Sequence, residues 1–129
     1  MSYPEVRRGS AEEFEKLTDE LTEELLSSPT AASATVNGTL LRYWTWGGTG
    51  QPLVLLHGLA STRRIWDFVA PLLAQDFSVV ALDQRGHGES AKPDGGYDFA
   101  TVAADLNGLL RALKTESPIL VGHSWGANV

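Results

Sequence analysis

The sequence predicts an α/β protein with a mostly parallel sheet, helices on both faces and an N-terminal hairpin. Three observations predict this class. Apolar runs at 52–59, 77–83 and 118–123 are typical of buried strands. Apolar residues at helical spacing lie between these runs, and an Asn-Gly pair at 37–38 is typical of a hairpin turn ahead of them. Strands that alternate with helices in this way form parallel sheets that are covered on both faces.

The composition is that of one folded domain. Hydrophobic residues make up 43% of the 129 residues, which is ordinary for a globular chain and argues against disorder. No apolar run approaches the length of a membrane span and no segment resembles a signal sequence, so we expect a cytoplasmic protein without a membrane partner. Because cysteine is absent, the chain has no disulfide frame, thiolate metal site or cysteine nucleophile.

Negative charge is concentrated near the N-terminus. Seven acidic residues and one lysine lie between residues 10 and 28, and this segment accounts for the whole formal net charge of −6. The other acids and bases balance, so no basic surface is expected, which argues against nucleic acid as a partner. We interpret the acidic run as the solvated side of a helix, and a docking surface is the alternative.

The first expected element is an amphipathic helix that begins at the capping-box pattern of residues 10–13. Its apolar residues recur at helical spacing, and Pro29 ends the run. Residues 27–33 are predicted to be a linker, so that residues 1–34 form an acidic helix and linker ahead of a domain at 35–129. The apolar positions of the helix are Phe14, Leu17, Leu21 and Leu25.

A β-hairpin is expected from Thr35 through Trp46. Asn37-Gly38 is the preferred two-residue hairpin turn, and this interpretation is better than the glycosylation sequon that residues 37–39 also match. The glycine cluster at 47–50 precedes a strand instead of linking a strand to a helix. It therefore cannot present a helix N-terminus to a pyrophosphate, and we expect no dinucleotide or other cofactor.

Two helices are expected between the three apolar strands. The first would follow the His-Gly pair at 57–58, and the second would be capped by Asp98. Each carries apolar residues at helical spacing, which predicts one apolar face per helix. These residues are Ile65, Phe68, Val69, Leu72 and Leu73 in the first helix, and Phe99, Val102, Leu106, Leu109, Leu110 and Leu113 in the second.

The last strand leads into residues 122–126, which read Gly-His-Ser-Trp-Gly and have the form G-x-S-x-G. This spacing suits a strand that turns into a helix so sharply that the serine is exposed in a strained conformation. A Cβ at Gly122 or Gly126 would crowd the turn. The pattern also recurs by chance, but the strand, turn and helix setting favours the catalytic interpretation. Ser124 is therefore the predicted nucleophile, placed at the positive end of the next helix.

Three blocks in this order resemble the α/β-hydrolase superfamily. They are the His-Gly pair at 57–58, the turn at 83–90 with the form D-x-R-G-x-G-x-S, and the G-x-S-x-G elbow at 122–126. The resemblance covers roughly residues 36–129. The elbow is closest in form to the haloalkane dehalogenase and epoxide hydrolase branch, whose members carry aspartate where this chain has Ser124.

That difference matters for the chemistry implied by the resemblance. Dehalogenation and epoxide opening alkylate a carboxylate and give an ester that water can cleave, whereas a serine ether would be a dead end. Resemblance to the serine-bearing members implies acyl chemistry on a small-molecule carbonyl substrate. The activities implied are those of an esterase, a carbon–carbon bond hydrolase, a peptidase of the proline-iminopeptidase kind, a perhydrolase or an acyltransferase.

The resemblance also assigns roles around Ser124. The backbone N–H groups of Leu59 and Trp125 would donate to the oxyanion. Histidine at 123 is expected to point to the other side of the turn from Ser124, and His87 to shape its loop. No metal site is expected, because no ligand pair shows the required spacing. The residues expected to support the motifs are His57, Gly58, Gly122, His123, Gly126, and Asp83 with Arg85 as a structural turn pair.

The predicted triad is incomplete in this chain. In this fold the acid and the histidine follow the nucleophile, and only residues 127–129 follow Ser124. We therefore expect the N-terminal part of an α/β-hydrolase domain, truncated after the elbow and inactive as it stands. The alternative is a non-catalytic binding or interaction protein that uses half of this scaffold. The strand at 118–123 would be an exposed edge, through which we expect self-association.

Overall fold

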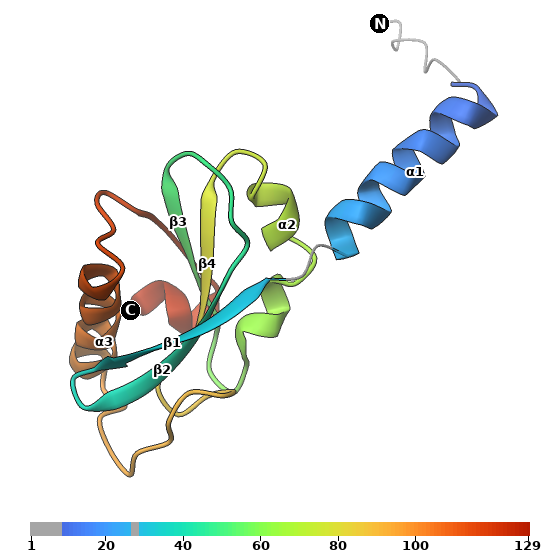
Figure 1. The fold of residues 1–129 in the computed structure, drawn as a ribbon. Helices are drawn as coiled ribbons and strands as arrows, with labels where there is room; N and C mark the ends of the chain where they lie inside the picture. The colour runs from blue at the N-terminus through green and yellow to red at the C-terminus, as the bar shows by residue number, and fades with distance from the viewer. Residues whose placement is uncertain (1–8, 27–28) are drawn as a thin grey trace, which may run out of the picture.

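The computed structural model describes residues 9–26 and 29–129 (Figure 1). One five-stranded sheet has the order β1-β2-β4-β3-β5. β3 pairs in parallel with β4 and β5, whereas β2 pairs antiparallel with β1 and β4. The α/β class with an N-terminal hairpin is confirmed, and the hairpin makes the sheet mixed. The strands are β1 (Thr30–Val36), β2 (Thr39–Thr45), β3 (Pro52–Leu56), β4 (Ser78–Asp83) and β5 (Ile119–Gly122).

The hairpin between β1 and β2 turns at Asn37 and Gly38, as predicted. Their φ angles are 52° and 74°, and a two-residue hairpin turn requires such positive values. β1 begins at Thr30, inside the segment predicted to be a linker, so that prediction was wrong for residues 30–33. The small residues there carry no apolar strand signal, and pairing with β2 makes them a strand.

The sheet is covered on both faces, as expected for strands with continuous apolar runs. Helix α3 (Phe99–Ala112) lies on one face, and the 3-10 helix η1 (Arg63–Trp66) with α2 (Ala70–Leu73) lies on the other (Figure 1). Alternate residues of each strand join different clusters. The cluster under α3 contains Val36, Leu41, Val54, Leu56, Leu82, Leu106 and Leu109, and the other contains Trp44, Trp46, Leu53, Leu55, Ala70, Val79 and Ala81.

Helix α3 begins where the sequence predicts. The Asp98 carboxylate accepts a hydrogen bond from the Thr101 backbone N–H at 3.0 Å, which confirms the predicted cap. Val102, Leu106 and Leu109 are buried against the sheet. Phe99 was predicted to join this apolar face, but it is 47% exposed and lies near the end of the helix that approaches the elbow.

The segment formed by η1 and α2 corrects the predicted apolar face of the first helix. Four of the five predicted core positions are exposed, and a second apolar stripe, made of Trp66, Ala70 and Leu73, packs against the sheet instead. Both stripes have helical spacing, so the sequence pattern cannot distinguish them. The exposed residues are Ile65 (42%), Phe68 (73%), Val69 (44%) and Leu72 (41%).

Helix α1 (Ala11–Leu26) begins with the predicted capping box. The Glu13 N–H donates to Ser10 Oγ at 3.2 Å, and the Ser10 N–H donates to the Glu13 carboxylate at 3.3 Å. The helix extends away from the sheet in Figure 1, and Phe14 and Leu17 are exposed. The side chains of the other two predicted apolar positions, Leu21 and Leu25, lie outside the described residues.

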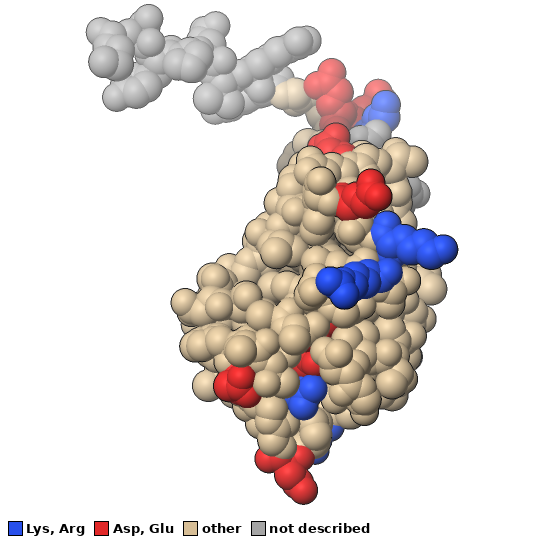
Figure 2. Space-filling view, turned by 90° about the vertical axis from the view of Figure 1, so that its left-hand side faces the viewer, with Lys and Arg blue, Asp and Glu red and all other residues tan. Residues whose placement is uncertain are grey.

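The surface of the body carries scattered charges of both signs. Figure 2 shows the side on which α3 lies, where most residues are uncharged and the blue side chains form no broad cluster. No helix in the two described ranges is long and apolar enough to cross a bilayer. At the sheet edge, β5 pairs with β3 on one side, and Leu120 is 50% exposed. Self-association through this edge stays a prediction.

Candidate active site

The turn between β5 and the 3-10 helix η2 (Ser124–Asn128) carries the predicted nucleophile. Ser124 has a φ of 55°, which is rare for a residue with a side chain, and it is exposed. This backbone matches the strained, exposed serine that the G-x-S-x-G spacing predicts. The segment after the strand is a 3-10 helix of five residues.

Both elbow glycines are required by close backbone contacts. A Cβ on Gly122 would lie 2.5 Å from the Ala127 backbone nitrogen. A Cβ on Gly126 would lie 2.5 Å from the carbonyl oxygen of His57 and 2.8 Å from that of Leu56. The elbow therefore rests directly on the end of β3, and no side chain fits between the two.

The loop after β3 lies beside the elbow. A Cβ on Gly58 would lie 3.3 Å from Ser124 Cβ and 3.3 Å from the His123 carbonyl oxygen. Leu59 follows Gly58 in this loop and Trp125 follows Ser124 in the elbow, so the two predicted oxyanion donors belong to the two segments that meet at Gly58. Their role stays a prediction.

His57 is buried with both ring nitrogens engaged. Its Nδ1 donates to the Gly58 carbonyl oxygen at 2.7 Å, and its Nε2 accepts from the Gln84 backbone N–H at 3.0 Å. A backbone amide can only donate, so this network assigns the neutral ring with its proton on Nδ1. The geometry leaves no nitrogen to receive the Ser124 proton, in keeping with the supporting role expected of His57.

Burial is the main cause that lowers the pKa of His57 below its ordinary 6.5, and nearby His87 acts in the same direction. The Gly58 carbonyl and Asp83 oppose this shift. On acidification, the unfolded chain takes up the proton first, near pH 6.5. The contribution of His57 to the free energy of unfolding is therefore expected to be fully present above pH 6.5 and to decrease as the pH drops toward the lower folded pKa.

Urea unfolding between pH 5 and 8 measures this dependence. Below pH 6.5 the free energy of unfolding of the wild-type chain should decrease as the pH falls. The His57→Gln variant should lose the part of this slope that His57 causes. The exposed His123 provides the matched control, since His123→Gln should keep that slope. An unchanged slope in His57→Gln would contradict the assignment.

His87 ties the turn after β4 to the loop after β3. Its Nε2 accepts from the Ala60 N–H at 3.1 Å, and its Nδ1 donates to the Arg85 carbonyl oxygen at 2.9 Å. Its ring centroid lies 4.8 Å from that of His57. These contacts support the loop-shaping role that the sequence suggests for His87.

His123 is exposed, and its side chain lies near the loop after β3. Its Nδ1 would be 3.4 Å from a Cβ on Gly58, close to the 3.3 Å separation of Ser124 Cβ from that same position. Both groups therefore lie near Gly58, and the expected separation of the two side chains by the turn stays a prediction.

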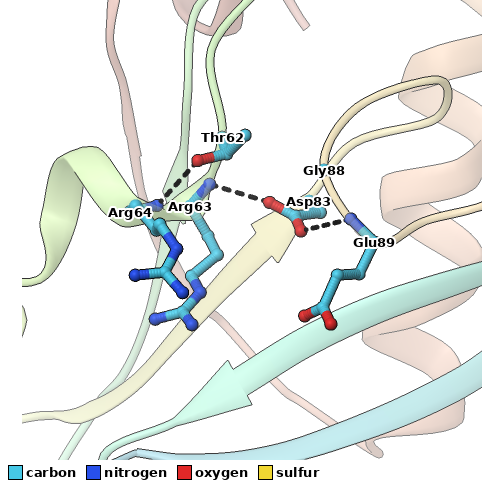
Figure 3. A pocket seen from close by; sticks show the side chains of 6 residues that line it. All are labelled: Thr62, Arg63, Arg64, Asp83, Gly88 and Glu89. Carbon is cyan, nitrogen blue, oxygen red and sulfur yellow. Dashed lines mark hydrogen bonds between the residues drawn. The ribbon is translucent and has the colours of Figure 1, made fainter.

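Asp83 is a structural residue at the end of β4. Its carboxylate accepts from the backbone N–H of Arg63 at 2.8 Å and from that of Glu89 at 2.9 Å (Figure 3). Figure 3 shows the carboxylate between these two segments, in a pocket also lined by Thr62, Arg64 and Gly88. Both oxygens are thus used to join the loop after β3 to the turn after β4.

Arg85 does not pair with Asp83, so the predicted turn pair was wrong. Its guanidinium binds both carboxylate oxygens of Asp105 on α3, at 2.8 and 3.1 Å, and donates to the Gly95 carbonyl oxygen. The Asp105 hydrogen bond, followed by its charge, raises the pKa of Arg85. Sequence reasoning missed Asp105, because its position on the predicted helix gave no sign that it is buried.

An aromatic surface borders Ser124. The Trp125 ring stacks on Phe99 with a centroid distance of 5.7 Å, and it lies 6.1 Å from the His87 ring. Gln84 also reaches this region, because its side-chain nitrogen donates to the His57 carbonyl oxygen at 2.7 Å. Sequence reasoning assigned no site role to Phe99 or Gln84. In the described ranges, no three His, Asp or Glu side chains cluster as ligands for a metal.

Comparison with known proteins defines the class. A profile of the alpha/beta hydrolase fold matches residues 51–129. The solved structure of an epoxide hydrolase superposes with a TM-score of 0.73 at 41% identity, covering 77% of this chain and 35% of that one. An E-2-(acetamidomethylene)succinate hydrolase superposes with a TM-score of 0.74 at 34% identity, covering 78% of this chain and 37% of that one.

Relatives found by sequence similarity support the same class. A soluble epoxide hydrolase of Corynebacterium sp. (strain C12) is 43% identical over 96 residues, which is 74% of this chain and 33% of that protein. A fluoroacetate dehalogenase of Burkholderia sp. is 45% identical over 85 residues, covering 62% and 28%. The chain therefore belongs to the alpha/beta hydrolase fold family, and it spans about a third of the length of these relatives.

Proposed function

We propose that this chain supplies the nucleophile and the oxyanion donors of a serine hydrolase that acts on an ester or a related carbonyl substrate. One observation carries the proposal. Ser124 is exposed with a φ of 55° at the end of a parallel strand, next to the Gly58 loop. The Leu59 and Trp125 N–H groups would stabilise the oxyanion formed when Ser124 Oγ attacks a carbonyl carbon.

The identity of the nucleophile separates this proposal from the activities that the relatives are named for. Epoxide opening and dehalogenation through a covalent intermediate need a carboxylate, whose alkyl ester water can cleave. The elbow of this chain presents a hydroxyl, which suits an acyl intermediate. We therefore favour acyl transfer to water, or to another acceptor, over epoxide or carbon–halogen chemistry.

The general base that accepts the Ser124 proton is not expected to be His57 or His87. His57 and His87 each have both nitrogens engaged in hydrogen bonds. In this fold the acid and the histidine of the triad come after the nucleophile in sequence. We propose that residues corresponding to the remaining two thirds of the relatives supply them, and that this chain alone is almost inactive.

The engaged histidines also favour a second candidate, a non-catalytic interaction protein built on this part of the fold. The test compares the chain alone with the chain continued by its own downstream coding sequence, or by the corresponding segment of the Corynebacterium relative. The hydrolase proposal expects weak ester turnover by the chain alone and fluorophosphonate labelling at Ser124 in the continued protein.

Ser124→Ala is the matched variant for this test, and it should abolish both labelling and turnover in the continued protein. Removing one triad member generally costs several orders of magnitude in rate. A folded continued protein that is never labelled would favour the interaction protein. Strong turnover by the chain alone that survives Ser124→Ala would contradict the serine mechanism.

A further inference from the structure

Gln84 is a buried amide directly after β4, and it holds one residue of the neighbouring loop. It is only 1% exposed. Its side-chain Nε2 donates to the His57 carbonyl oxygen at 2.7 Å, and its backbone N–H donates to His57 Nε2 at 3.0 Å. Because a carbonyl oxygen can only accept, the amide nitrogen is the atom that faces it. Two hydrogen bonds from one residue therefore fix both the ring and the peptide of His57.

The oxygen of the same amide is buried without such a contact. Gln84 Oε1 has no hydrogen-bond partner among the residues that the structure describes. A buried acceptor without a partner lowers the stability of a fold. An apolar side chain of similar length would avoid that cost, so stability gives little reason for an amide at this position. Local conflicts of this kind are typical of functional positions.

The His57 carbonyl, which the amide holds, is a point of contact with the elbow. A Cβ on Gly126 would lie 2.5 Å from the His57 oxygen, so the elbow backbone rests directly on it. The next residue, Gly58, lies beside the nucleophile, because a Cβ there would be 3.3 Å from Ser124 Cβ. Leu59, whose N–H is the proposed oxyanion donor of this loop, follows Gly58. A shift of the His57 peptide would therefore change the distance between the nucleophile and this donor.

We propose that Gln84 is a positioning residue, which sets the distance between the Leu59 loop and the elbow through the His57 carbonyl. This role rests on the proposed serine hydrolase function, and it needs no contact between Gln84 and the substrate. Oxyanion donors act only within about 2.7–3.1 Å of the developing charge, so a small displacement weakens them. The effect should appear in kcat, because the lost interaction forms only in the transition state, whereas KM should change little.

Gln84→Met in the continued protein tests this role. Methionine is similar in length, and it removes the unpartnered Oε1 while leaving at most the His57 carbonyl oxygen without a partner. The free energy of unfolding should therefore change little. The rate of fluorophosphonate labelling at Ser124 and the kcat for an ester should both fall about 10-fold or more, with KM within about twofold of the wild-type value. Val102→Ala, at a buried position on α3, is the control, which should lower stability and keep the wild-type labelling rate.

Gln84→Glu separates the hydrogen bond from side-chain packing. A protonated carboxyl can donate to the His57 carbonyl oxygen, whereas a carboxylate can only accept. Burial raises the pKa of the introduced carboxyl. His57, His87 and Asp83 also titrate in this region, so each labelling rate is divided by the wild-type rate at the same pH. This ratio should approach one at low pH and decrease as the pH rises through the pKa of the introduced carboxyl.

The wild-type continued protein is the reference for both variants. If it folds but is never labelled at Ser124, the serine mechanism is overturned, and the role of Gln84 with it. If it is labelled and Gln84→Met is labelled at the same rate, only the role of Gln84 is overturned. A Gln84→Glu ratio that stays constant across the pH series has the same consequence, and this series decides the matter if Gln84→Met does not fold.

Discussion

Asp105→Ala is expected to destabilise the fold by about 3–5 kcal/mol, because it leaves the buried Arg85 guanidinium without its counter-charge. The side chains of Asp105 and Arg85 are only 2% and 9% exposed, so water cannot replace the lost carboxylate. A domain of this kind is stable by about 5–15 kcal/mol in total, so the loss would be a large share of its stability. Equilibrium urea unfolding measures the change.

The control is a second ion pair, Arg63–Asp67, whose side chains are 12% and 33% exposed and 2.8 Å apart. Asp67→Ala should cost less, about 1 kcal/mol, because the Asp67 side chain is 33% exposed and water can take the place of the lost carboxylate. A double variant, Arg85→Met with Asp105→Leu, should recover much of the stability lost in Asp105→Ala, since no charge is then left unpaired. Equal losses in Asp105→Ala and Asp67→Ala would show that burial of the Arg85 pair is not what matters.

Gly126→Ala is expected to destabilise the chain by about 3 kcal/mol or more and to abolish labelling of Ser124 in the continued protein. The added Cβ would lie 2.5 Å from the His57 carbonyl oxygen. Neither atom can rotate away, because the backbone fixes the position of both. The elbow would have to move off the end of β3, which shifts Ser124 away from the Leu59 N–H. Urea unfolding and fluorophosphonate labelling report the two effects.

Gly95→Ala is the matched control, because a Cβ there would meet nothing within 4 Å. This variant should stay within about 1 kcal/mol of the wild-type chain and keep full labelling. If Gly126→Ala behaved like Gly95→Ala, the close packing of the elbow on β3 would not be needed for the site.

Several features of the fold were predictable because they depend on neighbouring residues. The apolar runs located β3, β4 and β5, and Asn37-Gly38 located the hairpin turn through its need for positive φ. Asp98 marked the start of α3 through a hydrogen bond that spans three residues. The spacing of residues 122–126 likewise indicated a strained serine, since strand, turn and glycine requirements are all local.

Other predictions failed where two stretches of sequence carried the same signal. The stripe of Ile65, Phe68 and Leu72 has the same helical spacing as the stripe of Trp66 and Leu73, and only the second faces the sheet. The small residues of β1 lack an apolar pattern and form a strand because β2 pairs with them. Periodicity gives the conformation of a segment, whereas its buried side depends on what packs there.

The sequence by itself determined the α/β class, the positions of the central strands and the conformation of Ser124, because these follow from periodicity and local backbone sterics. Only the tertiary structure decided that Arg85 pairs with Asp105, that Gln84 and Gly58 set the proton position on His57, and that Asp83 joins two loops. The reason is physical. Charged and polar groups in a buried setting must find partners, and for Arg85 and His57 these lie 20 and 27 residues away, at distances that no local pattern records.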